Sequence, residues 1–161
     1  MTLILIDGYN CRFFAKIGNT MNNSLPKGKI PTVFVSSTCY DLSQIRLDLK
    51  IFLEEQLGFE ALLSEFNSFP LSPGLNSIEN CLKNVKERAD LFVLIIGGRY
   101  GHITDKGKSV TNLEYLQARA KKIPIYVFID FKILTTLTLW KDNKAGDFSS
   151  ITYGIFRTLQ N

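Results

Sequence analysis

The sequence DLFVLIIGG, residues 90–98, contains six consecutive apolar residues followed by two glycines, and it indicates the fold more directly than any other segment. A strand with one face in water alternates apolar and polar residues, and this run does not alternate. It therefore predicts a strand that is buried on both faces. Three shorter strands are predicted on similar grounds, in TVFVSS (32–37), FEALLSE (59–65) and IPIYVFI (123–129).

Segments with helical spacing separate the predicted strands. The first follows Asp41, which we expect to cap it, and ends before Gly58, which suits a left-handed position after a helix. The second covers SIENCLKNVKERA (77–89), and the third begins near Ser109. Strands that alternate with helices predict an α/β fold, a flavodoxin-like, doubly wound parallel sheet in three layers.

The two ends of the chain differ from this regular middle. LILI (3–6) predicts an added strand or a loose arm, and the polar segment 18–30 predicts a linker. Residues 1–30 are thus separated from a domain of residues 31–161. Near the other end we expect helical turns around 131–140, a polar loop over 141–150 and a final short helix.

Composition excludes several classes of protein. No run reaches the roughly 18 apolar residues of a membrane span, and the start of the chain lacks the basic region of a signal peptide. We therefore expect a soluble cytoplasmic protein. Three scattered cysteines and one histidine, His102, argue against a disulfide framework or a metal site. Cys81 is expected to be a buried, inert thiol.

The net charge of +4 fits weak attraction to anionic ligands such as dinucleotides. The basic clusters near Arg88 and Lys121 are not interleaved with aromatic residues, so nucleic-acid binding is not expected. Arg46, on the first predicted helix, is expected to be solvated or ion-paired.

Candidate binding residues follow the predicted strands, because ligands of such sheets lie beyond the carboxyl ends of the strands. Hydroxyl groups after the first strand suit ribose or phosphate, and the glycine amides and Arg99 after the third suit a phosphate. Tyr40 is a candidate for stacking on a base. The alternative for each of these residues is a purely structural role, in a turn or at the surface. The full set is Ser36, Ser37, Thr38, Tyr40, Gly97, Gly98, Arg99, Tyr100, Ser109 and Asn112.

Glu114 has two competing interpretations. Thr111-Asn112-Leu113-Glu114 has the spacing of a capping box, in which Thr at the N-cap and Glu three residues later bind each other's backbone amides. Alternatively, the carboxylate at the start of this helix faces a ligand at the sheet edge. The two roles are compatible.

Several motifs together resemble an uncharacterised bacterial domain family. They are VFVSSTCYDL (33–42), LGFEALLSEFNSFPLSPG (57–74), ENCLKNV (79–85), ADLFVLIIGGRYG (89–101) and SVTNLEYLQARAKKIPIYVFI (109–129). The family is usually N-terminal in NTPase or repeat proteins, and it is similar to TIR domains and nucleoside 2-deoxyribosyltransferases. The resemblance covers about residues 30–150.

The resemblance implies a catalytic role for Glu114. The transferases carry a Gly-Thr-x-x-Glu stretch whose Glu is the nucleophile, and its layout matches Thr111, Glu114, Ala118, Lys122 and Pro124. NAD-cleaving TIR domains place their Glu a few residues beyond a Ser, which Ser109 and Glu114 fit. Three features depart from these families. Cys81 or Leu82 stands where the transferases have an acidic partner, with Glu79 only nearby, and Val110 replaces their Gly. The Trp-Cys pair of TIR domains is absent.

The function expected from this resemblance is cleavage of an N-glycosidic bond, with Glu114 stabilising or trapping an oxocarbenium-like state. NAD is the preferred substrate because nicotinamide leaves as a neutral molecule and needs no proton donor. No cofactor is expected, and activity is expected to require self-assembly, with an NTPase or repeat protein as a further partner. The alternative is a non-catalytic module for nucleotide sensing or self-association in bacterial signalling or defence.

Overall fold

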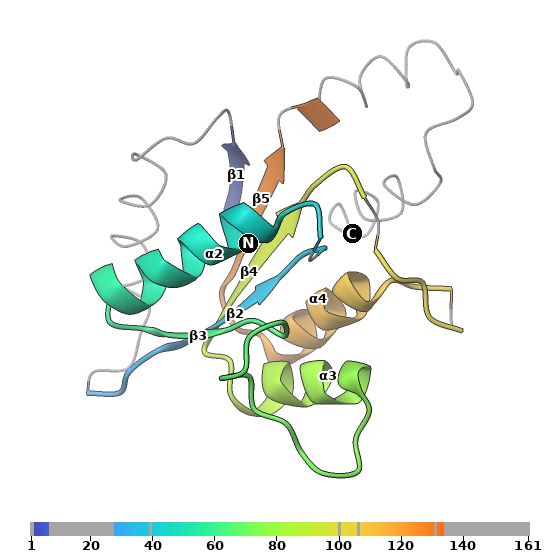
Figure 1. Ribbon diagram of the computed structural model, residues 1–161, viewed down its shortest axis with the longest axis horizontal. Coiled ribbons are helices and arrows are strands. Elements are labelled where there is room, and N and C mark those ends of the chain that lie inside the picture. The colour runs from blue at the N-terminus through green and yellow to red at the C-terminus, as the bar shows by residue number, and fades with distance from the viewer. Residues whose placement is uncertain are drawn as a thin grey trace.

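Figure 1 shows the computed structural model of the chain, which describes residues 2–6, 28–38, 40–99, 101–105, 107–130 and 132–133. For residues 2–6 only the backbone is described. In chain order, the elements are β1 (Thr2–Ile6), β2 (Thr32–Ser36), α2 (Ser43–Ile51), the π-helical turn η1 (Phe52–Gln56), β3 (Glu60–Leu62), α3 (Ser77–Glu87), β4 (Leu91–Ile96), α4 (Val110–Lys121) and β5 (Ile125–Asp130).

The five strands form one sheet in the order β1-β5-β4-β2-β3, and every neighbouring pair is parallel. The predicted flavodoxin-like α/β fold is confirmed. β2 and β4 are adjacent, while β3 lies on the other side of β2, so the chain reverses its direction of travel across the sheet between them. Ligands of doubly wound sheets bind at such a switch point, beyond the carboxyl ends of the two strands.

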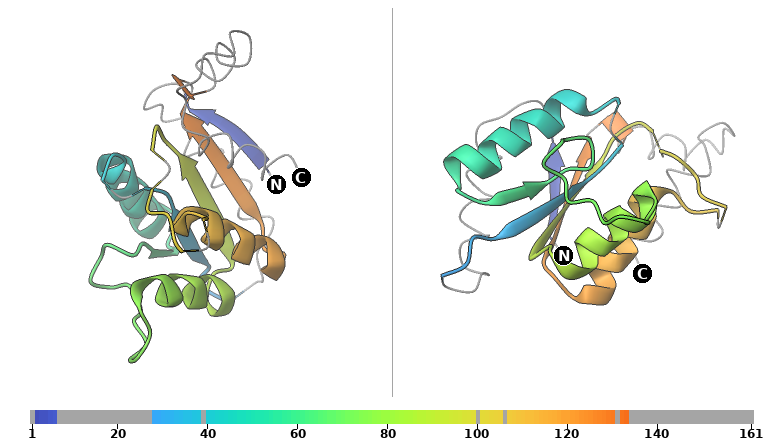
Figure 2. Two further views of the ribbon diagram at one scale, coloured as in Figure 1. Left: turned by 90° about the vertical axis from the view of Figure 1, so that its right-hand side faces the viewer. Right: turned by 60° about the horizontal axis from the view of Figure 1, so that its bottom comes forward.

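Helices cover both faces of the sheet, which gives the three predicted layers (Figure 2). On one face, α2 and η1 pack through Leu49 and Leu53 against Val33 and Val35 of β2. On the other face, α3 and α4 lie side by side against the alternate residues of the strands, including Phe34. All described side chains of β2 and β4 are buried, as the apolar runs predict.

Local signals explain where several helices begin and end. Asn76 and Glu79 form a capping box at the start of α3, which sequence inspection missed. At the other end of α3, the Lys121 ammonium from α4 donates to the carbonyl oxygens of Val85 and Ala89, at 3.2 and 2.6 Å. Gly58 has φ of 68° and follows the first helix, as predicted.

The prediction that Asp41 caps the first helix is wrong. α2 begins at Ser43, its N-cap residue is Leu42, and no side chain caps it. Asp41 instead points towards the end of β4, where its Oδ2 atom lies 3.2 Å from the place a Cβ on Gly97 would occupy.

The N-terminal segment adds a strand to the sheet. β1 pairs with β5 over five residues, from Thr2 with Tyr126 to Ile6 with Asp130. Residues 7–27 and 134–161, with most of the predicted linker, the polar loop and the final helix, lie outside the described residues. The predicted domain boundary near residue 30 stays a prediction. Among the described helices, none combines the length and apolar character that a membrane crossing requires.

Candidate functional site

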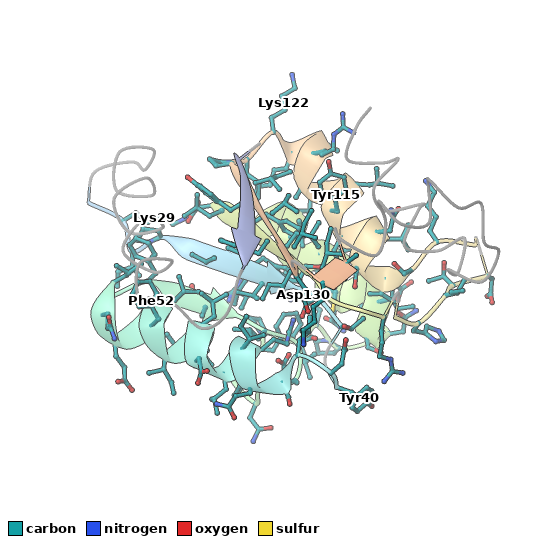
Figure 3. The ribbon with its side chains drawn as sticks, turned by 90° about the horizontal axis from the view of Figure 1, so that it is seen from above. Lys29, Tyr40, Phe52, Tyr115, Lys122 and Asp130 are labelled. Carbon is teal, nitrogen blue, oxygen red and sulfur yellow. The ribbon has the colours of Figure 1, made fainter. Side chains whose placement is uncertain are left out.

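The carboxyl edge of the sheet brings together three segments that are distant in sequence. Figure 3 looks onto this edge, with Asp130 at the end of β5 near its centre and Tyr40 at its periphery. The segments are the end of β2, the loop after β4 and the first turns of α4. This convergence is what parallel strands at a switch point produce, and it agrees with the sequence prediction.

Glu114 is the centre of this cluster. Its residue is 5% exposed, and its Oε2 atom accepts a hydrogen bond of 2.5 Å from Ser36 Oγ. Ser36 is the last residue of β2 and lies on the same face of the sheet as Phe34, because side chains alternate along a strand. The Cys81 thiol of α3 also donates a hydrogen bond to the carboxylate. Three elements therefore hold one acidic side chain.

The capping-box interpretation of Glu114 is wrong. Ser109 is the N-cap of α4, and its Oγ atom accepts a hydrogen bond of 3.2 Å from the Asn112 amide. An antiparallel bridge between Ile103 and Ser109 fixes the point where the helix starts. Glu114 then lies five residues beyond the N-cap, too far along the helix to reach the N-cap amide. The carboxylate is directed to the sheet edge instead.

Burial raises the pKa of Glu114 to about 7. The hydrogen bonds from Ser36 and Cys81 and the positive charge of Arg46 oppose this effect, while the negative charge of Glu65 adds to it. The loss of water on burial has the largest effect on the pKa, because it disfavours the charged form of the carboxyl group more than the hydrogen bonds and the positive charge favour it. Near neutral pH, Glu114 is thus divided between its protonated and ionised forms.

A partly buried ion pair lies on the α2 side of β2, near this carboxylate. Arg46 is 1% exposed, and its Nε and Nη2 atoms donate to the two Glu65 carboxylate oxygens at 2.5 and 2.6 Å. Its Nη1 atom donates to Ser37 Oγ at 2.7 Å. The Arg46 guanidinium thereby fixes Ser37, which is adjacent in sequence to Ser36, the hydrogen-bond donor to Glu114.

Thr38, Gly101 and Thr111 form a second contact region at the edge. A Cβ atom on Gly101 would lie 3.1 Å from Thr38 Cγ2 and 3.9 Å from Thr111 Oγ1. Gly101 has φ of 85°, which favours glycine. The Thr38 hydroxyl is buried, and it has no hydrogen-bond partner among the described residues. A buried polar group of this kind calls for a partner, and the described residues supply none.

The remaining predicted binding residues are spread between the interior and the surface. Gly97 is buried against Asp41 and Leu42, whereas Gly98 and Arg99 are exposed. Tyr40 is 88% exposed. Ser109 and Asn112 are buried at the start of α4, where they form the cap. Tyr100 lies outside the described residues.

Sequence inspection did not place Glu65 near the candidate site, and it treated Cys81 as inert. A signal for Glu65 exists, since it follows the apolar run ALL at the carboxyl end of a predicted strand. Cys81 is buried as expected, but its thiol contacts the central carboxylate. In the described part of the chain, no group of three metal-ligating side chains occurs.

The family assignment rests on one comparison. The model of a family described as a domain of unknown function, DUF4062, matches residues 32–154. The chain belongs to this family. No curated protein and no solved structure shows significant similarity to it.

The DUF4062 match includes the whole carboxyl-edge cluster, from Ser36 to Glu114. β1 lies before the matched residues, although it pairs with β5 in the same sheet. The candidate site thus lies within the matched residues, and β1 lies before them at the edge of the sheet.

Proposed function

We propose that this DUF4062 domain cleaves the N-glycosidic bond of a nucleotide, with NAD as the preferred substrate and Glu114 as the catalytic carboxylate. The observation that carries the proposal is the hydrogen bond between Ser36 and Glu114 at the switch point of the sheet. A carboxylate whose pKa lies near 7 is unusual, and such groups concentrate at functional sites.

The chemistry needs a single ionised oxygen close to the anomeric carbon. When the bond between ribose and nicotinamide breaks, the bonding electrons leave with nicotinamide, which becomes neutral. Positive charge then develops on the ribose, and the Glu114 carboxylate stabilises or traps it until water adds to the anomeric carbon. The added water loses one proton, and the products are nicotinamide and ADP-ribose.

The resemblance to TIR domains and to nucleoside 2-deoxyribosyltransferases supports the same role. The helix position that resembles the acidic partner of the transferases is Cys81 here, and its side chain contacts Glu114. A thiol at this position is a poorer acid than a carboxyl group. NAD suits the site better than a nucleoside whose base must be protonated as it leaves.

The burial of Glu114 at the carboxyl edge of the sheet suits an effector domain that becomes active only when it assembles. Glu114 is 5% exposed in the single chain, so a ribose reaches it only after the segments around it move. Self-association of the domain would supply such a change. A cytoplasmic signalling or defence role, with an NTPase or repeat protein as partner, belongs to the same proposal.

The same burial favours a second candidate function. If the edge never opens, the Ser36–Glu114 pair only stabilises the fold, and the domain acts as a non-catalytic module that senses nucleotides or self-associates. The unpartnered Thr38 hydroxyl would then be one contact to the nucleotide.

Nicotinamide release from NAD, measured over a wide range of protein concentrations, tests the proposal. Wild type is expected to release nicotinamide with a rate per molecule that rises with concentration, and Glu114→Gln is expected to lose at least about a hundredfold of this rate. The matched control is Glu87→Gln, which removes an exposed carboxylate at the end of α3. Equal rates in wild type and Glu114→Gln would leave the non-catalytic function in place.

A further inference from the structure

Arg46 occupies an unusual place for a charged side chain on a helix that covers a sheet. It is among the largest fully buried side chains of the described chain, at 1% exposed. A guanidinium without water must find hydrogen-bond acceptors for its donors, and Arg46 binds both oxygens of Glu65. Glu65 itself keeps 30% of its side chain exposed, so the pair extends from the surface to the interior.

The guanidinium also reaches the end of β2. Its Nη1 atom donates to Ser37 Oγ at 2.7 Å, and Ser37 Oγ donates to the Thr38 carbonyl oxygen at 2.9 Å. The next residue in the other direction, Ser36, donates to Glu114. Arg46 and Glu114 thus approach the same short segment from opposite faces of the sheet.

We propose that Arg46 is a positioning residue for Glu114, clamped by Glu65 so that its guanidinium fixes the end of β2, where Ser36 donates to the Glu114 carboxylate. The catalytic part of this inference rests on the proposed function. The geometric part does not, because the contacts exist whether or not the domain turns over a substrate.

Four groups that bear charge or donate hydrogen bonds face Glu114 from the elements packed around it. Ser36 of β2 and Cys81 of α3 donate hydrogen bonds, Arg46 of α2 contributes a positive charge, and Glu65 after β3 contributes a negative charge. Of these, Arg46 and Glu65 act with opposite signs. Removing one or the other should therefore move the titration of Glu114 in opposite directions.

The experiment follows the titration of Glu114 by NMR of the side-chain carboxyl carbon in the full chain, with Glu114→Gln to assign the signal. Arg46→Gln is expected to shift the midpoint upward by about one pH unit, because the nearby positive charge is lost. Arg46→Lys, which keeps the charge, is expected to restore most of the wild-type midpoint. Leu49→Ala is the control, since Leu49 is a buried residue of the same helix in the apolar cluster.

A second variant keeps the test decisive if Arg46→Gln does not fold. Glu65→Gln leaves Arg46 charged and removes the opposing negative charge, so the midpoint of Glu114 is expected to fall. An unchanged midpoint in Arg46→Gln, an unchanged or raised midpoint in Glu65→Gln, or a shift of equal size in Leu49→Ala overturns the inference.

Nicotinamide release separates this inference from the proposed function. If the domain is active, Arg46→Gln is expected to lose about fivefold of the rate at pH 7, because a midpoint one unit higher lowers the ionised fraction of Glu114 by about this factor. It is expected to recover most of the rate at pH 9, where Glu114 is ionised in both proteins. Absence of turnover with shifted midpoints would overturn the function and support the positioning role. Turnover with unshifted midpoints would do the reverse.

Discussion

Ser36 Oγ and Glu114 Oε2 lie 2.5 Å apart, which joins the carboxyl end of β2 to the beginning of α4 across 78 residues of sequence. The hydrogen bond is buried, and it ends on a carboxylate whose pKa burial raises to about 7. One contact thus couples the packing of α4 on the sheet to the protonation of an acidic side chain.

The first prediction concerns stability as a function of pH. Glu114 has a pKa of about 7 in the folded chain against an ordinary 4.5, so the folded state binds its proton more tightly. The associated stability is fully present below pH 4.5 and is lost as the pH rises through 7. This loss of stability amounts to about 3 kcal/mol. Glu114→Gln has no carboxyl group to titrate at this position, so its stability should not show the loss.

Urea unfolding at several pH values between 4 and 8.5 measures this effect. The difference in unfolding free energy between wild type and Glu114→Gln should change steadily in favour of the variant as the pH rises. Glu87→Gln, which neutralises an exposed carboxylate, should follow wild type at every pH. A difference that stays constant with pH would show that Glu114 titrates normally.

The second prediction isolates the hydroxyl of Ser36. Hydrogen bonds to an ionised group are worth about 1.5–3 kcal/mol, and Ser36→Ala removes one that favours the ionised form of Glu114. The cost of the substitution should therefore be larger at pH 8.5 than at pH 5, by about 1 kcal/mol or more. Thr104→Ala removes an exposed hydroxyl that donates to the Lys108 carbonyl, so its cost should not depend on pH.

The architecture could be predicted from sequence because it depends on local patterns. The run LFVLII of β4 is buried along its whole length, as its lack of alternation indicates. The parallel arrangement follows from the alternation of strands and helices. The order of the strands was not predicted, because several orders are compatible with that alternation. The candidate edge was found for the same reason, since Ser36 and the Gly97–Arg99 segment directly follow strands.

The capping of α4 could not be predicted, because two residues with good N-cap chemistry lie two positions apart. Ser109 is chosen over Thr111 by contacts outside the helix, namely its bridge with Ile103 and the hydrogen bond from the Val110 amide to the His102 carbonyl. The role of Arg46 was equally hidden. Its helical spacing places it on the apolar face with Leu49 and Leu53, but a charged residue at such a position is not expected to be buried without a partner. That partner, Glu65, comes from a loop 19 residues away.

The third prediction tests this choice of N-cap. Ser109→Ala removes the oxygen that accepts the Asn112 amide, and loss of an N-cap side chain costs about 1 kcal/mol. Thr111→Val removes the hydroxyl at the position that the sequence favoured and keeps the shape of the side chain, so it should cost less than Ser109→Ala. Thermal unfolding of both variants at one pH gives the comparison. A larger cost for Thr111→Val would restore Thr111 as the main determinant of the helix start.

The fourth prediction compares two adjacent glycines at the switch point. A Cβ on Gly97 would lie 3.0 Å from Leu42 Cδ1 and 3.2 Å from Asp41 Oδ2, whereas a Cβ on Gly98 would meet nothing within 4 Å. Gly97→Ala should therefore destabilise the fold by about 1 kcal/mol, through the side chains that must shift. Gly98→Ala should change stability by no more than about 0.5 kcal/mol.

The two glycine variants should rank differently in nucleotide affinity than in stability. Gly98→Ala, which barely affects folding, should weaken binding. Gly98 is exposed next to the carboxyl end of β4, where backbone amides can approach a phosphate only if no side chain intervenes. Gly98→Ala should weaken NAD binding by about tenfold, which corresponds to about 1.4 kcal/mol, while it unfolds like wild type. Calorimetric titration with NAD, beside thermal unfolding, measures both quantities. Wild-type affinity in Gly98→Ala would remove the glycine turn from the binding site and leave Arg99 and the hydroxyls of Ser36–Thr38 as candidates for the phosphate contact.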